Sequence, residues 1–163
     1  MFGERYNYMV SALLNEPEDY FKSFAELMPE ELLYPMIVLD AFIGNEDRHV
    51  RNFDIVIHED GSTTMAPLYD HGASLLAWVS DENLASAGLV GRLDKSKPFR
   101  TKHSAQIKLV KSMRQLGMSK EALMEFILEK ITPTLSLLPQ QRARAIVAYL
   151  RWRTKYLKVM GVT

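Results

Sequence analysis

The stretch GNEDRHVRN, Gly44 to Asn52, separates two segments whose hydrophobic periodicity differs. Before it, residues 32–43 are apolar almost all round, which predicts a buried central helix that ends at Gly44-Asn45. After it, apolar and polar residues alternate from Phe53 to His58, a period of two that predicts a strand. An Asp-Gly pair then marks a turn before a second strand, so the pattern predicts a β-hairpin over 53–68.

A second polar motif, PLYDHG at 67–72, follows this hairpin directly. Because the two strands are nearly equal in length, Asp70 is expected to return beside the loop that holds Asp47 and Asn52. Two carboxylates and a carboxamide then converge at one end of a small sheet. Oxygen ligands of this kind suit Mg²⁺, which takes one or two carboxylates together with waters and substrate phosphates. The alternative is that these are ordinary turn residues, since Asp and Asn favour turns.

The rest of the chain is predominantly helical in pattern. Helical spacing predicts short helices within residues 5–14 and over about 19–27. Clear periodicity is lost after Asp70, and the helical pattern returns over 101–161. The predicted fold is therefore mostly α with one β-hairpin, an α+β single domain over residues 1–163.

Three polar residues outside the two motifs lead to separate predictions. Asp40 lies within the apolar helix, and a buried carboxylate needs a partner, for which Arg48 and Arg51 are the candidates. His58 and His103 are expected to face solvent, and no His, Asp or Glu spacing indicates a zinc site.

Composition and charge limit the classes of protein to which the chain can belong. The 163 residues include no cysteine and no signal peptide or membrane-spanning stretch is indicated, which predicts a cytoplasmic protein without membrane partners. The net charge is zero, but residues 1–82 hold 16 acidic and 4 basic side chains, and the second half reverses this balance. Either the halves pack against each other, or the second half presents a basic surface to an acidic partner.

The predicted basic surface lies after Asp70 and on the C-terminal helices. Nucleic acid is the less favoured partner, because no recognised binding motif accompanies the charge. The cations expected to form this surface are Arg92, Lys95, Lys97, Arg100, Lys102, Lys108, Lys111, Arg114, Arg142, Arg144, Arg151, Arg153, Lys155 and Lys158.

The order of these motifs is that of a kinase catalytic loop and its metal-binding aspartate: a carboxylate, an amide five residues later, a hairpin and a second carboxylate. The stretch IGNEDRHVRNFDIV…MAPLYDHGASL resembles the catalytic core of HipA-like serine/threonine kinases, which are bacterial relatives of the protein-kinase fold and often toxins of toxin–antitoxin pairs. It is also similar, more distantly, to the loop of phosphoinositide 3/4-kinases. The resemblance covers residues 31–77 well and implies a protein-kinase-like C-terminal lobe.

The resemblance implies a role for each residue of the two motifs. Asp47 corresponds to the catalytic base, and Asn52 and Asp70 correspond to the metal ligands. Asn45 and His49 fall on positions that support the loop. The implied activity is transfer of the ATP γ-phosphoryl group to a protein Ser or Thr with Mg²⁺, and the implied partners are a protein substrate and an antitoxin-type protein.

The sequence before Asp47 lacks two motifs that a complete kinase needs. No glycine-rich loop and no strand lysine precede Asp47, so the nucleotide-binding lobe is expected to be absent and the residues that bind ATP stay unknown. The chain is therefore interpreted as part of an ATP-dependent kinase that is incomplete and inactive alone, with the missing lobe as a further partner. The alternatives are a non-catalytic interaction module that binds an acidic partner through its basic half, and a lipid-kinase fragment.

Overall fold

The predicted central helix is α3, Glu30–Ile43, in the computed structural model, which describes residues 5–6, 30–49, 52–85, 94–96, 101–109, 117 and 119–159. Its side chains are buried from Leu33 to Ile43, apart from the exposed Pro35 and the half-buried Leu39. The helix is enclosed because no face of it is polar enough to meet water. It forms the centre of the hydrophobic core and leads directly into the loop that begins at Gly44.

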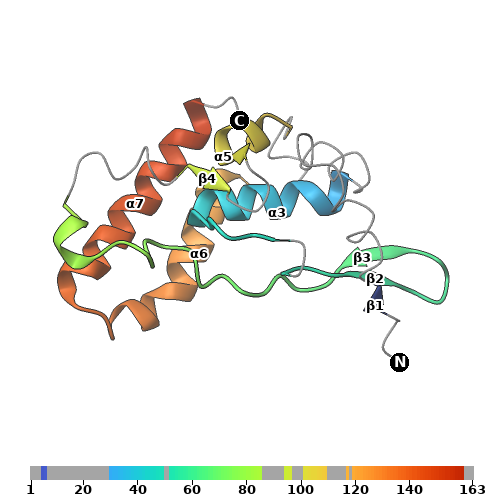
Figure 1. Ribbon diagram of the computed structural model, residues 1–163, viewed down its shortest axis with the longest axis horizontal. Coiled ribbons are helices and arrows are strands. Elements are labelled where there is room, and N and C mark those ends of the chain that lie inside the picture. The colour runs from blue at the N-terminus through green and yellow to red at the C-terminus, as the bar shows by residue number, and fades with distance from the viewer. Residues whose placement is uncertain are drawn as a thin grey trace.

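Two long helices complete the core around α3 (Figure 1). The helix α6, Lys120–Leu135, begins at Ser119, whose side chain accepts a hydrogen bond from the Ala122 N–H at 3.1 Å. The helix α7, Gln140–Val159, contacts both α6 and α3. Among the described residues, no helix combines the length and the hydrophobicity that a membrane span requires.

A small antiparallel sheet lies at the end of the molecule opposite α7 (Figure 1). The strands β2, Ile55–Ile57, and β3, Thr63–Met65, pair with Val56 opposite Thr64, which confirms the predicted hairpin. The strand β1, Arg5–Tyr6, pairs with the other edge of β2, so the helix predicted for residues 5–14 is wrong at these two positions. Cross-strand pairing outweighs a weak local helical pattern here.

The prediction of a single hairpin is also corrected, whereas the predicted irregular segment after Asp70 contains few regular elements among its described residues. A 3₁₀ turn, η1, spans Asp81–Asn83, and a second two-stranded sheet joins β4, Lys95–Ser96, to β5, Thr101–Lys102. Helical structure then starts with α5, His103–Gln106, and continues as η2, Ile107–Leu109. The predictions for residues 19–27 and 110–116 lie outside the described residues.

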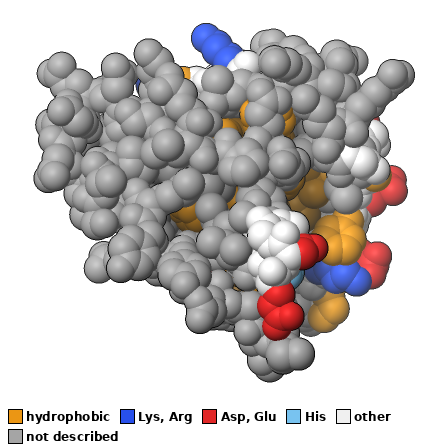
Figure 2. All heavy atoms as spheres, turned by 90° about the vertical axis from the view of Figure 1, so that its right-hand side faces the viewer, with side chains coloured by type: hydrophobic (Ala, Val, Ile, Leu, Met, Phe, Trp, Pro, Cys, Tyr) orange, Lys and Arg blue, Asp and Glu red, His pale blue; other side chains and the backbone are white. Residues whose placement is uncertain are grey.

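The end of the molecule that carries the hairpin shows only a few described side chains. In the view from that end, Asp and Glu side chains lie at the surface beside a few hydrophobic and a few Lys or Arg side chains (Figure 2). Glu59 and Asp60, in the hairpin turn, are both exposed.

Candidate functional site

The loop over 44–52 starts at the C-terminal cap of α3. Gly44 adopts φ +66°, and the Asn45 N–H donates to the Asp40 carbonyl at 2.9 Å, which is the six-to-one bond of a Schellman cap. A Cβ atom on Gly44 would lie 1.9 Å from the Tyr149 hydroxyl oxygen. Only glycine meets both demands, so the sequence fixes where α3 stops and the loop begins.

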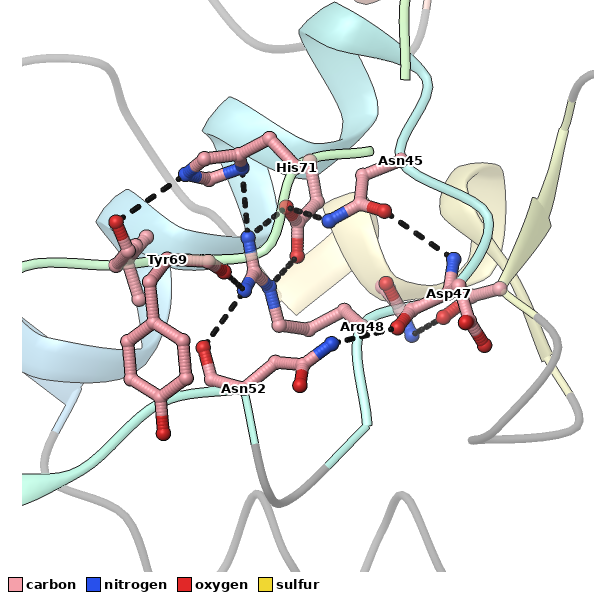
Figure 3. Close-up of polar contacts among 10 residues, drawn as sticks. Asn45, Asp47, Arg48, Asn52, Tyr69 and His71 are labelled. Carbon is pink, nitrogen blue, oxygen red and sulfur yellow. Dashed lines mark hydrogen bonds and ion pairs between the residues drawn. The ribbon is translucent and has the colours of Figure 1, made fainter. Parts of the chain in front are cut away.

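Arg48 is the centre of the site (Figure 3). Its Nε and Nη2 donate to the two Asp40 carboxylate oxygens, each at 2.9 Å. Its Nη1 donates to the Asn52 carbonyl at 2.8 Å and to the Tyr69 carbonyl at 2.7 Å, and its Nη2 contacts His71 Nδ1 at 3.0 Å. These five contacts match the five N–H groups of a guanidinium, so a side chain only 1% exposed is fully hydrogen-bonded.

The contact with Arg48 fixes the tautomer of His71. A guanidinium can only donate, so His71 Nδ1 accepts and the ring proton resides on Nε2. His71 Nε2 in turn contacts the Leu68 carbonyl at 3.3 Å, where an acceptor is available. The imidazole is therefore held in one orientation between Arg48 and its own chain.

Asp40 is the buried anion that balances Arg48, and this confirms the predicted pairing. Asn45 Nδ2 also donates to Asp40 Oδ1 at 3.0 Å. Burial raises the pKa of Asp40, while the hydrogen bond and charge of Arg48 and the bond from Asn45 act in the opposite direction. The bidentate geometry makes this a charge-assisted pair in a water-excluded position.

The loop is braced internally by its two amide side chains. Asn45 Oδ1 accepts from the Asp47 N–H at 3.2 Å, and Asn52 Nδ2 donates to the Asp47 carbonyl at 3.3 Å. The Asn52 N–H donates to the His49 carbonyl at 2.8 Å. The main chain of Asp47 is thus held by hydrogen bonds to Asn45 and Asn52 (Figure 3).

The structure brings the two predicted motifs together through their main chains. One nitrogen of Arg48 bonds the carbonyls of both Asn52 and Tyr69, the residue before Asp70. Asp47 and Asp70 are exposed, whereas Asn52 is buried. Asp70 adopts φ +56°, a left-handed conformation, just outside the buried network. The convergence of the Asp47 and Asp70 carboxylates stays a prediction.

The burial of two residues near the site, both distant from it in the sequence, was not predicted. His103 is 1% exposed and Arg153 is fully buried, so the prediction that His103 faces solvent and the place of Arg153 in a basic surface are both wrong. Arg153 Nε donates to the Ala41 carbonyl, near the end of α3. Five buried polar atoms in this region have no hydrogen-bond partner among the described residues. They are both ring nitrogens of His103, Nη1 and Nη2 of Arg153, and the Tyr149 hydroxyl oxygen.

The remaining cations of the predicted basic surface fall into three groups. Arg142 pairs with Asp81 at 2.6 Å, so it too is removed from the predicted basic surface. Exposed side chains are those of Lys95, Lys102, Lys108, Arg144, Arg151 and Lys155. The side chains of Arg92, Lys97, Arg100, Lys111, Arg114 and Lys158 lie outside the described residues.

Buried His103 should make the stability of the protein fall in mild acid. Burial and the charge of Arg153 lower the pKa of His103 to about 3, although Asp94 and the Asn45 main chain act the other way. The unfolded chain takes up this proton near pH 6.5, so between these values it binds more protons than the folded chain, and stability rises with pH. We expect a loss of about 2 kcal/mol between pH 7 and pH 5, measured by urea unfolding.

The variant His103→Leu separates this titration from other acid effects. Leucine removes the proton uptake and leaves no ring nitrogen unpaired, so the pH dependence of the unfolding free energy should flatten. The variant Ile107→Val, at a buried neighbour, should lower stability but keep the slope. Equal slopes in wild type and His103→Leu would contradict the assignment.

Comparison with known proteins identifies the family. The family model described as the HipA-like C-terminal domain matches residues 17–147, which include the loop, the hairpin and Asp70. No curated protein and no solved structure matches the chain. Because the family model covers most of the sequence, the chain belongs to the HipA-like C-terminal domain family.

Proposed function

We propose that this domain is the catalytic lobe of a HipA-like serine/threonine kinase, which transfers the ATP γ-phosphoryl group to a protein hydroxyl. The observation that carries the proposal is the joint contact of Arg48 with Asn52 and Tyr69. This contact ties the loop with the expected base to the segment with the second aspartate, as the proposed chemistry requires. Membership of the HipA-like family supports it.

Each polar residue of the loop has a proposed task. Asp47 is exposed and its main chain is fixed by two amide contacts, so its carboxylate can accept or orient the proton of the substrate hydroxyl. Asn52 Nδ2 is engaged by the Asp47 carbonyl, which leaves the amide oxygen as the donor atom for a metal ion. Asp70 supplies the second ligand. Asn45 and His49 support the loop.

The donor set fits Mg²⁺ rather than a softer metal. The candidate ligands are the Asp70 carboxylate and the Asn52 amide oxygen, which are both hard oxygen donors, and among the described residues no three His, Asp or Glu side chains are grouped as a metal cluster. Mg²⁺ accepts such a small protein contribution because waters and phosphate oxygens complete its shell. When bound with ATP, it would neutralise phosphate charge; Asp70 and Asn52 would hold it, and Arg48 would keep their main chains in register.

Removing the proposed working groups should abolish phosphoryl transfer without unfolding the protein. We expect Asp47→Asn and Asp70→Asn to lower the transfer rate from radiolabelled ATP by at least about a hundredfold, because each acts on charge in the transition state. Both side chains are exposed, so the melting temperature should change little. Asp60→Asn, in the hairpin turn, is the matched control and should keep full activity.

The transfer assay is therefore run on a complete enzyme that includes a nucleotide-binding lobe. For this chain alone we expect weak binding of Mg-ATP in titration calorimetry, because its sequence shows no glycine-rich motif that would bind the phosphates. Micromolar affinity for this chain alone would contradict that expectation. Unchanged transfer by both variants in a complete enzyme would contradict the kinase proposal itself.

One observation favours a non-catalytic interaction module as the second candidate. On α7, Arg144, Ala148, Arg151 and Lys155 are all exposed and recur at helical spacing, so three cations form one solvent-facing stripe. An acidic protein, such as an antitoxin-type partner, fits this stripe by charge. If transfer is absent from the complete protein but charge reversal at Arg151 abolishes partner binding, this second candidate is preferred.

A further inference from the structure

Asp54 lies at the open end of the hairpin, two residues after Asn52. Its carbonyl accepts a hydrogen bond from the Ala66 N–H at 2.9 Å, and its carboxylate oxygen Oδ2 accepts one from the Tyr69 hydroxyl at 3.3 Å. Asp54 therefore binds the returning chain twice, once through its main chain and once through its side chain. The second contact is made by the residue that directly precedes Asp70.

The Asp54 carboxylate depends on this hydroxyl group. Asp54 is only 9% exposed, and among the described residues no Lys or Arg forms an ion pair with it. A buried carboxylate without a cation needs hydrogen-bond donors, and the Tyr69 hydroxyl supplies one. Because the acceptor is charged, this bond is stronger than one between neutral groups. It therefore restrains the Tyr69 ring, although 41% of that residue is exposed.

Tyr69 is thus held at both of its ends. Its carbonyl accepts from Arg48 Nη1 at 2.7 Å, and its ring points away from Arg48 and His71 (Figure 3). His71 is held as well, because its Nδ1 contacts Arg48 Nη2 at 3.0 Å. Asp70 therefore lies between two residues whose positions are fixed.

The conformation of Asp70 depends on these two neighbours. Asp70 adopts φ +56°, which is uncommon for a residue other than glycine. Such main-chain conformations cost free energy and persist only where the surroundings enforce them. A Cβ on Gly72 would lie 3.7 Å from Asp70 Oδ1, so the carboxylate is turned back towards its own chain. The direction of this carboxylate is set by how residues 69 and 71 are held.

We propose that Tyr69 and Asp54 are positioning residues for Asp70, and that their hydrogen bond keeps its carboxylate at the spacing from Asn52 that a divalent cation requires. Arg48 joins the same two segments through their carbonyls, whereas Tyr69 and Asp54 join them through side chains. Groups that orient metal ligands change metal affinity without touching the metal. The inference rests on the proposed function, because that function makes Asp70 and Asn52 the metal ligands.

The test measures binding of Mn²⁺, a stand-in for Mg²⁺, to the full chain by electron paramagnetic resonance. We expect Tyr69→Phe, which removes only the hydroxyl, to raise the dissociation constant about tenfold. Asp54→Ala should do the same, and Asp54→Asn, which keeps an oxygen acceptor, should recover most of the affinity. Tyr149→Phe is the matched control and should bind as the wild type does, because its hydroxyl has no hydrogen-bond partner among the described residues.

Two further measurements separate positioning from a general loss of structure. The double variant Tyr69→Phe with Asp54→Ala should be no weaker than either single variant, because both changes break one contact. In a complete enzyme, Tyr69→Phe should raise the Mg²⁺ concentration for half-maximal transfer about tenfold while the rate at saturating Mg²⁺ stays near that of the wild type. Partial unfolding would lower the rate at every Mg²⁺ concentration instead.

The outcomes distinguish this inference from the kinase proposal. Unchanged Mn²⁺ affinity in Tyr69→Phe, or a double variant whose effect is the sum of the two single effects, would overturn the positioning role and leave the kinase proposal intact. No Mn²⁺ binding by the wild type, or binding that Asp70→Asn does not alter, would contradict the metal role of Asp70 and the positioning role with it.

Discussion

Replacing Arg48 by alanine is expected to destabilise the domain by about 3–5 kcal/mol, the effect of removing one partner of a buried ion pair. The variant leaves the Asp40 carboxylate, which is 3% exposed, without its bidentate partner. It also leaves the carbonyls of Asn52 and Tyr69 without their shared donor. Urea unfolding monitored by circular dichroism measures the change.

Two comparisons show whether the buried pair is the cause. Lys130→Ala removes the cation of an exposed pair with Glu129 and should change stability by less than about 0.5 kcal/mol. The double variant Asp40→Leu with Arg48→Met removes both charges and should recover part of the lost stability. A cost for Arg48→Ala no larger than that for Lys130→Ala would contradict the role assigned to Arg48.

Gly44→Ala is expected to cost about 3 kcal/mol or more, in contrast to most single-methyl changes. Two effects add: the positive φ of Gly44 disfavours any L-residue, and the new methyl group would meet the Tyr149 hydroxyl at 1.9 Å. Tyr149 is itself buried and cannot easily move aside. The loss of stability is measured as a lower midpoint of urea unfolding.

The chain provides matched controls for this substitution. Gly61 and Gly117 also have positive φ, but a Cβ on either would contact nothing within 4 Å. Gly61→Ala and Gly117→Ala should therefore cost only the conformational penalty of about 1 kcal/mol. Tyr149→Phe should partly rescue Gly44→Ala, because it removes the nearest atom. Equal costs at all three glycines would show that the contact with Tyr149 is unimportant.

Features that depend on nearby residues could be predicted from the sequence. The buried helix and the hairpin follow from their periodicities, and the partner of Asp40 lies only eight residues along the chain. The membership of the HipA-like family followed from the loop and the second motif together. In each case the deciding residues lie within a short stretch.

Features that depend on distant contacts could not be predicted. Arg142 reaches Asp81 across 61 residues, and Arg153 reaches Ala41 across 112 residues. A basic helix looks the same in sequence whether its arginines meet solvent or a buried carbonyl, so the predicted surface included both. Likewise, strands of two residues such as β1, β4 and β5 are too short to show a period.

The bond from Arg153 to Ala41 has a consequence for the order of events during synthesis. A protein is made from its N-terminus, so α3 and the loop after it leave the ribosome well before α7 exists. Until Arg153 arrives, the Ala41 carbonyl lacks its native donor and the space beside Gly44 lacks Tyr149. The contacts within residues 40–52 can form before α7 is made, but the surroundings of the helix end are completed only when the last helix docks.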